Sequence, residues 1–134
     1  MPGKTVLLVD THEDSRAIYA TILKHHGFGV LAAAFHAEGV RLARERLPDL
    51  IVLEYGLPRS EALEAAHALR SDALTGTIPL LALSTAFSEA DRERALAAGF
   101  SAYLLKPCPP LQLLAETRRL LGMRLHNGHE ASRE

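Results

Sequence analysis

Residues 49–58 read DLIVLEYGLP, an apolar run that ends in an acid, Glu54, before a glycine and proline turn. The run does not alternate polar and apolar residues, which is typical of a strand covered on both faces. A second run, TVLLVD at residues 5–10, also ends in an acid, Asp10. The two runs together predict a parallel sheet between helices, with carboxylates at the ends of its strands.

Segments with helical spacing separate the apolar runs. Ile18, Ile22 and Leu23 share one face of a helix, and SEAD at residues 88–91 has the spacing of a capping box. Strand and helix alternate five times in all, which predicts an open α/β sheet with right-handed connections. The predicted strands cover residues 5–10, 29–34, 50–54, 79–85 and 102–106.

The composition is that of one globular domain. The chain has 134 residues, of which 48% are hydrophobic and 23% are charged, so it is long enough to bury a single core. We expect this domain to cover residues 1–122 and a polar tail to cover residues 123–134. Fifteen basic and sixteen acidic residues leave a formal net charge of -1, so no overall field favours nucleic acid or an anionic membrane.

The same sequence argues for a cytoplasmic protein. No apolar stretch is long enough to span a bilayer, and the polar start MPGK leads directly into a strand-like run. The lone cysteine, Cys108, has no partner for an internal disulfide, which indicates a reducing compartment. We expect Cys108 to pack as a small apolar side chain.

Polar residues end four of the five runs: Asp10, Glu54, Thr85 and Lys106. Each alone is explained by a helix cap, a backbone hydrogen bond or an exposed sheet edge. Ligands of open α/β sheets, however, bind beyond the carboxyl ends of the strands, where these four side chains would meet. Two carboxylates, a hydroxyl and an ammonium suit a divalent cation together with a phosphoryl group.

These features make the chain resemble the receiver domain of bacterial response regulators over residues 4–121. The resemblance rests on VLLVD followed by Arg16, on PDLIVLEYGLP, on LALSTA and on AGFSAYLLKP, in the order and spacing of that family. It implies a flavodoxin-like (βα)5 fold with a five-stranded parallel sheet in the order 2-1-3-4-5. It also implies a role in two-component signal transduction, or phosphorelay, rather than catalysis.

The resemblance assigns roles to individual residues. Glu54 occupies the position of the phosphoacceptor, Lys106 contacts the phosphoryl group, and Thr85 rearranges to bind it. Tyr103 is the switch aromatic, and the Lys106-Pro107 peptide bond is expected to be cis. A magnesium ion would be bound by Asp10, Glu54 and the backbone carbonyl of Gly56.

The sequence departs from the family at two positions of this site. Glu54 stands where receivers have aspartate, and Thr11 stands where they have a second acid after the first strand. Because magnesium needs near-octahedral oxygen ligands, we expect it to bind weakly or not at all. The extra methylene of Glu54 moves its carboxylate toward the phosphoryl position, where Thr85 and Lys106 are its expected partners. Misplacement by about 1 Å costs on the order of 100-fold in transfer, so Glu54 should be a poor acceptor.

The sequence therefore predicts a stand-alone, atypical receiver that is not an enzyme and acts by binding a protein. The partner would be a histidine kinase, a phosphotransfer protein or an effector, docked on the face of the fourth helix, fifth strand and fifth helix; a homodimer stays possible.

Two alternatives stay open, a conventional phosphoacceptor receiver of a larger protein and a flavodoxin-like cofactor-binding protein or enzyme. The loop DTHEDS is acidic and no G-x-G-x-x-G sequence occurs, which disfavours the flavin protein. We expect His12, in that loop, to be a solvent-exposed histidine at the rim of the site.

Overall fold

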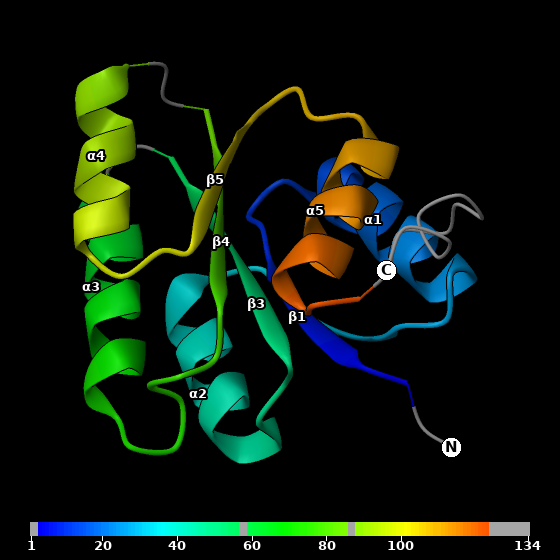
Figure 1. Ribbon diagram of the computed structural model, residues 1–134, viewed down its shortest axis with the longest axis horizontal. Coiled ribbons are helices and arrows are strands. Elements are labelled where there is room, and N and C mark those ends of the chain that lie inside the picture. Colours follow the sequence, from blue (N-terminus) through cyan, green and yellow to red (C-terminus); the bar gives the residue numbers. More distant parts are fainter. Residues whose placement is uncertain (1–2, 57–58, 86–87, 124–134) are drawn as a thin grey trace, which may run out of the picture.

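The computed structural model describes residues 3–56, 59–85 and 88–123, which fold as five strands and five helices in strict alternation (Figure 1). The strands are β1 (Thr5–Val9), β2 (Gly29–Ala33), β3 (Leu50–Tyr55), β4 (Leu80–Ser84) and β5 (Ala102–Leu105). The helices are α1 (Glu13–His25), α2 (His36–Arg46), α3 (Arg59–Ser71), α4 (Glu89–Ala97) and α5 (Pro110–Leu120). The tail expected at residues 123–134 lies, apart from Met123, outside the described residues.

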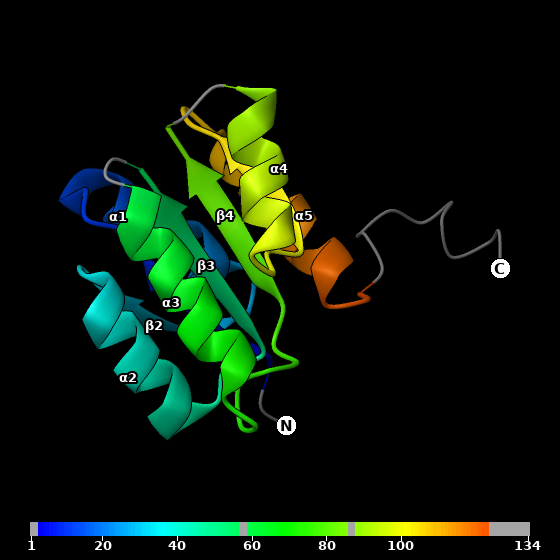
Figure 2. The ribbon, with the colours of Figure 1, turned by 90° about the vertical axis from the view of Figure 1, so that its left-hand side faces the viewer.

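All five strands are parallel and lie in the order β2-β1-β3-β4-β5, which confirms the predicted flavodoxin-like topology. Helices α1 and α5 cover one face of the sheet, and α2, α3 and α4 cover the other (Figures 1 and 2). No helix of the described chain is both long enough and apolar enough to cross a membrane.

The sheet divides the core into two layers because successive side chains of a strand point to opposite faces. Along β3, Leu50 and Val52 pack toward α1 and α5, whereas Ile51, Leu53 and Tyr55 pack toward α2, α3 and α4. All of these side chains are fully buried. The continuous apolar run at residues 50–53 therefore reflects a central strand with helices on both sides.

Local signals set several helix ends as the sequence predicts. Ser88 caps α4, since its hydroxyl accepts a hydrogen bond from the backbone N–H of Asp91. Gly27 follows α1 with a φ of 94°, a left-handed conformation that favours glycine. Ser88 and Gly27 thus mark the start of α4 and the end of α1.

Candidate functional site

The four polar residues at the strand ends, Asp10, Glu54, Thr85 and Lys106, belong to one face of the sheet. Each lies two positions after a residue that packs against α1 and α5, and alternation along a strand returns a side chain to the same face every second residue. The preceding residues are Leu8, Val52, Leu83 and Leu104. Position in the strand thus brings the four groups to the side on which α1 begins.

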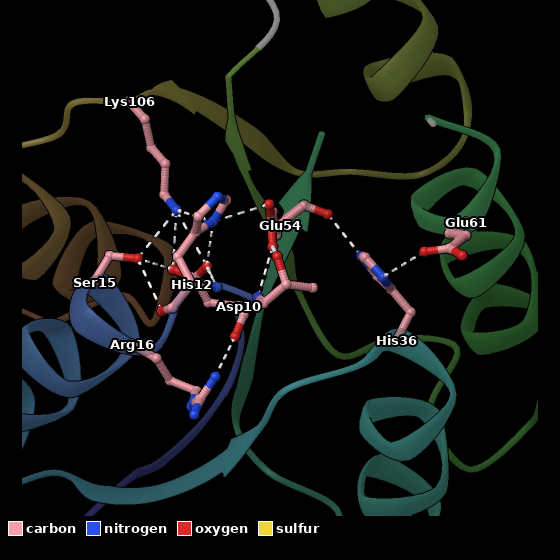
Figure 3. Close-up of polar contacts among 9 residues, drawn as sticks. Asp10, His12, Ser15, Arg16, His36, Glu54, Glu61 and Lys106 are labelled. Carbon is pink, nitrogen blue, oxygen red and sulfur yellow. Dashed lines mark hydrogen bonds and ion pairs between the residues drawn. The ribbon is translucent and has the colours of Figure 1, made fainter. Parts of the chain in front are cut away.

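Asp10 is fully buried and is the most densely bonded group of the site (Figure 3). Its Oδ2 accepts a hydrogen bond from the Ser15 hydroxyl at 2.6 Å, and its Oδ1 accepts one from the His12 backbone N–H at 2.9 Å. The Lys106 ammonium lies 3.0 Å from Oδ2 and 3.2 Å from Oδ1. Burial alone would raise the pKa of Asp10, but these donors outweigh it and hold the pKa below its ordinary value, so the carboxylate is charged.

Glu54 turns toward the loop after β1. Its Oε1 accepts hydrogen bonds from the backbone N–H and from the hydroxyl of Thr11, both at 2.7 Å. The expectation that Lys106 would be its partner is wrong, since Lys106 is instead bonded to Asp10. The glutamate side chain is long enough to reach two donors that the loop already presents, and these satisfy the buried charge.

His12 lies between the two carboxylates. Its Nδ1 is 3.3 Å from Asp10 Oδ1 and 3.3 Å from Glu54 Oε2, and it is 3.5 Å from the Lys106 ammonium. The side chain is 59% exposed, so the expectation of a solvent-exposed rim histidine holds for its exposure but misses its contacts. His12 is part of the site.

Thr85 is exposed and lines an open cleft of about 710 Å³ together with Lys106 and Asp14. Gly56 lies near both Glu54 and Thr85: a Cβ added there would be 3.2 Å from Glu54 Oε2 and 3.6 Å from the Thr85 hydroxyl. The structure therefore brings Asp10 and Lys106 into direct contact, and Thr85 lines the same cleft as Lys106.

Tyr103 faces the other side of the sheet, toward α3 and α4. Its hydroxyl is 3.0 Å from Ser84 Oγ, and its ring packs edge-on against Tyr55 with 5.9 Å between ring centroids. The side chain is half-buried and borders a groove with Ser88, Arg92 and Leu105. Tyr103 thus links the end of β4 to the surface beside α4.

Sequence reasoning missed two residues that support this site. Ser15 lies in the first turn of α1 and donates to Asp10, a contact that depends on where α1 begins and that the sequence spacing alone does not indicate. His36, at the start of α2, contacts the backbone carbonyl of Glu54 through Nε2 at 2.7 Å, while its Nδ1 is 3.7 Å from Glu61 (Figure 3). No local pattern indicates His36, because the contact joins α2 to β3.

The segment after β5 completes the cleft. The Lys106-Pro107 bond is cis, as predicted. Cys108 is buried beside Tyr19, whose hydroxyl donates to the Cys108 carbonyl at 2.8 Å. Burial raises the pKa of the Cys108 thiol, which keeps it protonated and fits the predicted packing role.

Magnesium, the ion that the resemblance implies, fits these donors poorly. It prefers six oxygen ligands in near-octahedral geometry at about 2.0 to 2.1 Å. Here the Thr11 hydroxyl donates to Glu54, Asp10 is engaged by Lys106, and the His12 nitrogen faces both carboxylates. No magnesium-dependent step follows from this arrangement.

Sequence comparison relates the chain to signalling proteins. A family model described as the response regulator receiver domain matches residues 6–118. The chain is similar to the phosphate regulon transcriptional regulatory protein PhoB of Pseudomonas aeruginosa, with 33% identity over 121 residues that cover 90% of this chain and 53% of that protein. An uncharacterized 14.6 kDa protein of Leptolyngbya boryana is 33% identical over 81% of this chain and 83% of its own length. The chain spans about half the length of the phosphate regulon regulators that it matches.

Comparison with solved structures also relates the chain to signalling proteins. The chemotaxis protein CheY4 of Vibrio cholerae superposes with a TM-score of 0.81 at 27% identity, covering 87% of this chain and 98% of that one. The receiver domain of a sensor histidine kinase from Pseudomonas aeruginosa superposes with a TM-score of 0.80 at 28% identity, over 90% of this chain and 98% of that one. That receiver was crystallised with a magnesium ion coordinated in its active-site cleft.

Proposed function

The chain belongs to the response regulator receiver family, and we propose that it is an atypical receiver whose output depends on binding a protein partner and not on phosphorylation at the end of β3. Receivers are signalling modules of two-component systems. Glu54 takes the position of the phosphoacceptor in this proposal, and magnesium binds weakly at Asp10, Glu54 and the Gly56 carbonyl.

The proposal rests on the hydrogen bonds that already occupy the Glu54 carboxylate. Two donors of Thr11 lie 2.7 Å from Oε1, and the residue is only 6% exposed. An acceptor oxygen must instead lie in line with the phosphoryl donor, and loss of that alignment lowers the transfer rate steeply. Because residue 11 is threonine, the site also lacks a second acid after β1 that would help to hold the cation.

Lys106 supports the same proposal. Its ammonium is bonded to Asp10 and to the Ser15 hydroxyl at 3.2 Å, and its side chain is only 12% exposed. To neutralise a phosphoryl group it would have to leave these partners. The resting contacts therefore stabilise a closed arrangement of Asp10 and Lys106 that forms without phosphate.

We place the partner surface on α4, β5 and α5, as the family resemblance suggests. The groove beside Tyr103 exposes Leu105 together with the charged residues Glu89 and Arg92. An apolar contact with a charged rim suits recognition of another protein. A histidine kinase, a phosphotransfer protein or an effector fits this description.

Treatment with acetyl phosphate and magnesium, followed by intact mass measurement, tests the proposal. We expect no phosphoryl adduct on the wild type and partial phosphorylation of Glu54→Asp, whose shorter side chain withdraws from Thr11. Adding Thr11→Asp to that variant should raise the yield again, by more than the sum of the single changes, because two acids then share one cation. A wild type that is phosphorylated as readily as the double variant would favour a conventional phosphoacceptor receiver.

A further inference from the structure

Three potential metal ligands converge in the site. Asp10, His12 and Glu54 each offer one ligand atom, and these atoms all lie within 4.8 Å of one another. The His12 nitrogen is 3.3 Å from an oxygen of each acid. Ligands of a tetrahedral zinc ion, bound at about 2.0 to 2.1 Å, are separated by about 3.3 to 3.4 Å. Adjacent ligands of octahedral magnesium are closer, at about 2.9 Å.

The identity of the donors points to the same class of ion. Imidazole nitrogen suits zinc and other late first-row divalent ions, whereas magnesium selects oxygen. Two carboxylates balance the charge of a divalent ion. We propose that Asp10, His12 and Glu54 form a zinc-type site that favours a transition-metal ion over magnesium.

The acids are held in place for this role by their other contacts. Thr11 fixes Oε1 of Glu54, which leaves Oε2 facing His12, and Oε2 accepts no hydrogen bond from the described residues. Ser15 binds Oδ2 of Asp10, and Oδ1, which accepts the His12 backbone N–H, faces the His12 ring. Hydrogen bonds that orient metal ligands in this way strengthen metal binding. Both acid side chains are more than nine-tenths buried, whereas His12 is exposed, so the ion is open to solvent on the histidine side.

Lys106 is the competing cation. Its ammonium is 3.2 Å from the ligand oxygen of Asp10 and 3.5 Å from the ligand nitrogen of His12. A bound ion would repel it toward Oδ2 of Asp10 and Ser15, where it already has partners. Removing this positive charge should therefore strengthen metal binding. Ion binding requires no phosphoryl transfer, so this inference goes beyond the proposed function.

Calorimetric titration of the full chain with Zn²⁺ and with Mg²⁺ tests the site. We expect one Zn²⁺ per chain, bound at least about tenfold more tightly than Mg²⁺. His12→Ala should weaken Zn²⁺ binding by more than about tenfold. Loss of a group that merely hydrogen-bonds to a metal ligand already costs about that much, and loss of a ligand should cost more. Lys106→Met should tighten it. Titration with Co²⁺, whose visible absorption reports tetrahedral coordination, should show that signal in the wild type and not in His12→Ala.

The control is the double variant His126→Ala/His129→Ala, which removes the histidines of the polar tail. It should bind Zn²⁺ as the wild type does. Binding that survives His12→Ala, that is lost with the tail histidines, or that is no tighter than for Mg²⁺ would overturn the proposal. Circular dichroism of each variant confirms that the fold is retained, and the phosphorylation assay on the wild type reports separately on the proposed function.

Discussion

Thr11 determines the direction in which the Glu54 carboxylate points. A carboxylate that is nearly buried needs hydrogen bonds, and Thr11 supplies two of them from the loop after β1. An acid at position 11 would provide no hydroxyl donor and would add a second negative charge beside Glu54. Threonine and glutamate at these two positions are therefore mutually compatible.

We expect Thr11→Val to lower the free energy of unfolding by about 1 to 2 kcal/mol, because it removes a hydroxyl donor from a charged acceptor but keeps the size of the side chain. Thr11→Ser, which keeps the hydroxyl, is the matched control and should stay within about 0.5 kcal/mol of the wild type. Urea unfolding at pH 7 measures both. Equal stability of the valine and wild-type proteins would show that the hydroxyl contributes nothing.

The sequence could predict which residues share the site but not which of them bond. Alternation along the strands places Asp10, Glu54 and Lys106 on one face, and this follows from pattern alone. The direction of the Glu54 carboxylate depends on where the Thr11 N–H points, which is a property of the folded loop. The sequence does not predict the contacts of His12 for the same reason, since its nitrogen reaches both acids only in that loop conformation.

At the scale of secondary structure, α2 ends in an unusual way. Its C-cap residue, Leu47, has a φ of 48° and a ψ of 64°, which is the left-handed region where a Cβ is unfavourable. Its N–H still bonds to the Ala43 carbonyl at 2.9 Å, and the side chain is 48% exposed. The helix therefore ends where glycine would ordinarily stand.

Replacing Leu47 by glycine should raise the free energy of unfolding by about 0.5 to 1 kcal/mol, because relief of the left-handed strain exceeds the entropy that glycine adds to the unfolded chain. Leu74→Gly is the control, since Leu74 is also exposed, at 62%, but is not in the left-handed region. That variant should be no more stable than the wild type. Thermal unfolding of both proteins decides the matter, and a less stable Leu47→Gly would mean that the leucine side chain makes contacts worth more than the strain.

Element boundaries were predicted to within about a residue where a local signal exists. The capping-box sequence at residues 88–91 begins α4, and the apolar run of β3 extends one residue further than expected, to Tyr55. Pro48 marks the end of α2, as proline often does just after a helix, but no sequence signal indicates that Leu47 is left-handed, since leucine rarely adopts that conformation. The strand order was implied by the family resemblance, because apolar patterns alone do not say which strands pair.

At the scale of the whole molecule, acidic residues hold distant parts of the chain together through charge. The pKa values of Asp10, Asp72 and Asp91 all lie below the ordinary value of 3.8. Asp91 is an example: burial alone would raise its pKa, but the Ser88 hydroxyl and the cations of Arg59 and Arg94 outweigh it. Such groups bind a proton more weakly in the folded protein than in the unfolded chain, so each favours folding while it is charged.

The sign of this linkage fixes the pH window. The stabilisation by Asp91 is fully present above its unfolded pKa, near 3.8, and is lost as the pH falls through its lower folded pKa. Asp91→Asn should therefore be less stable than the wild type at pH 7, and the difference should shrink as the pH falls from about 4 through the lower folded pKa of Asp91, because the wild-type carboxyl is then protonated as well. The urea midpoints of both proteins at pH 7, 4 and 3 measure this difference in stability. Glu93→Gln, at an exposed position of the same helix, is the control and should follow the wild type. A gap between Asp91→Asn and the wild type that stays constant with pH would mean that the charge of Asp91 is not what joins α4 to Arg59 at the start of α3.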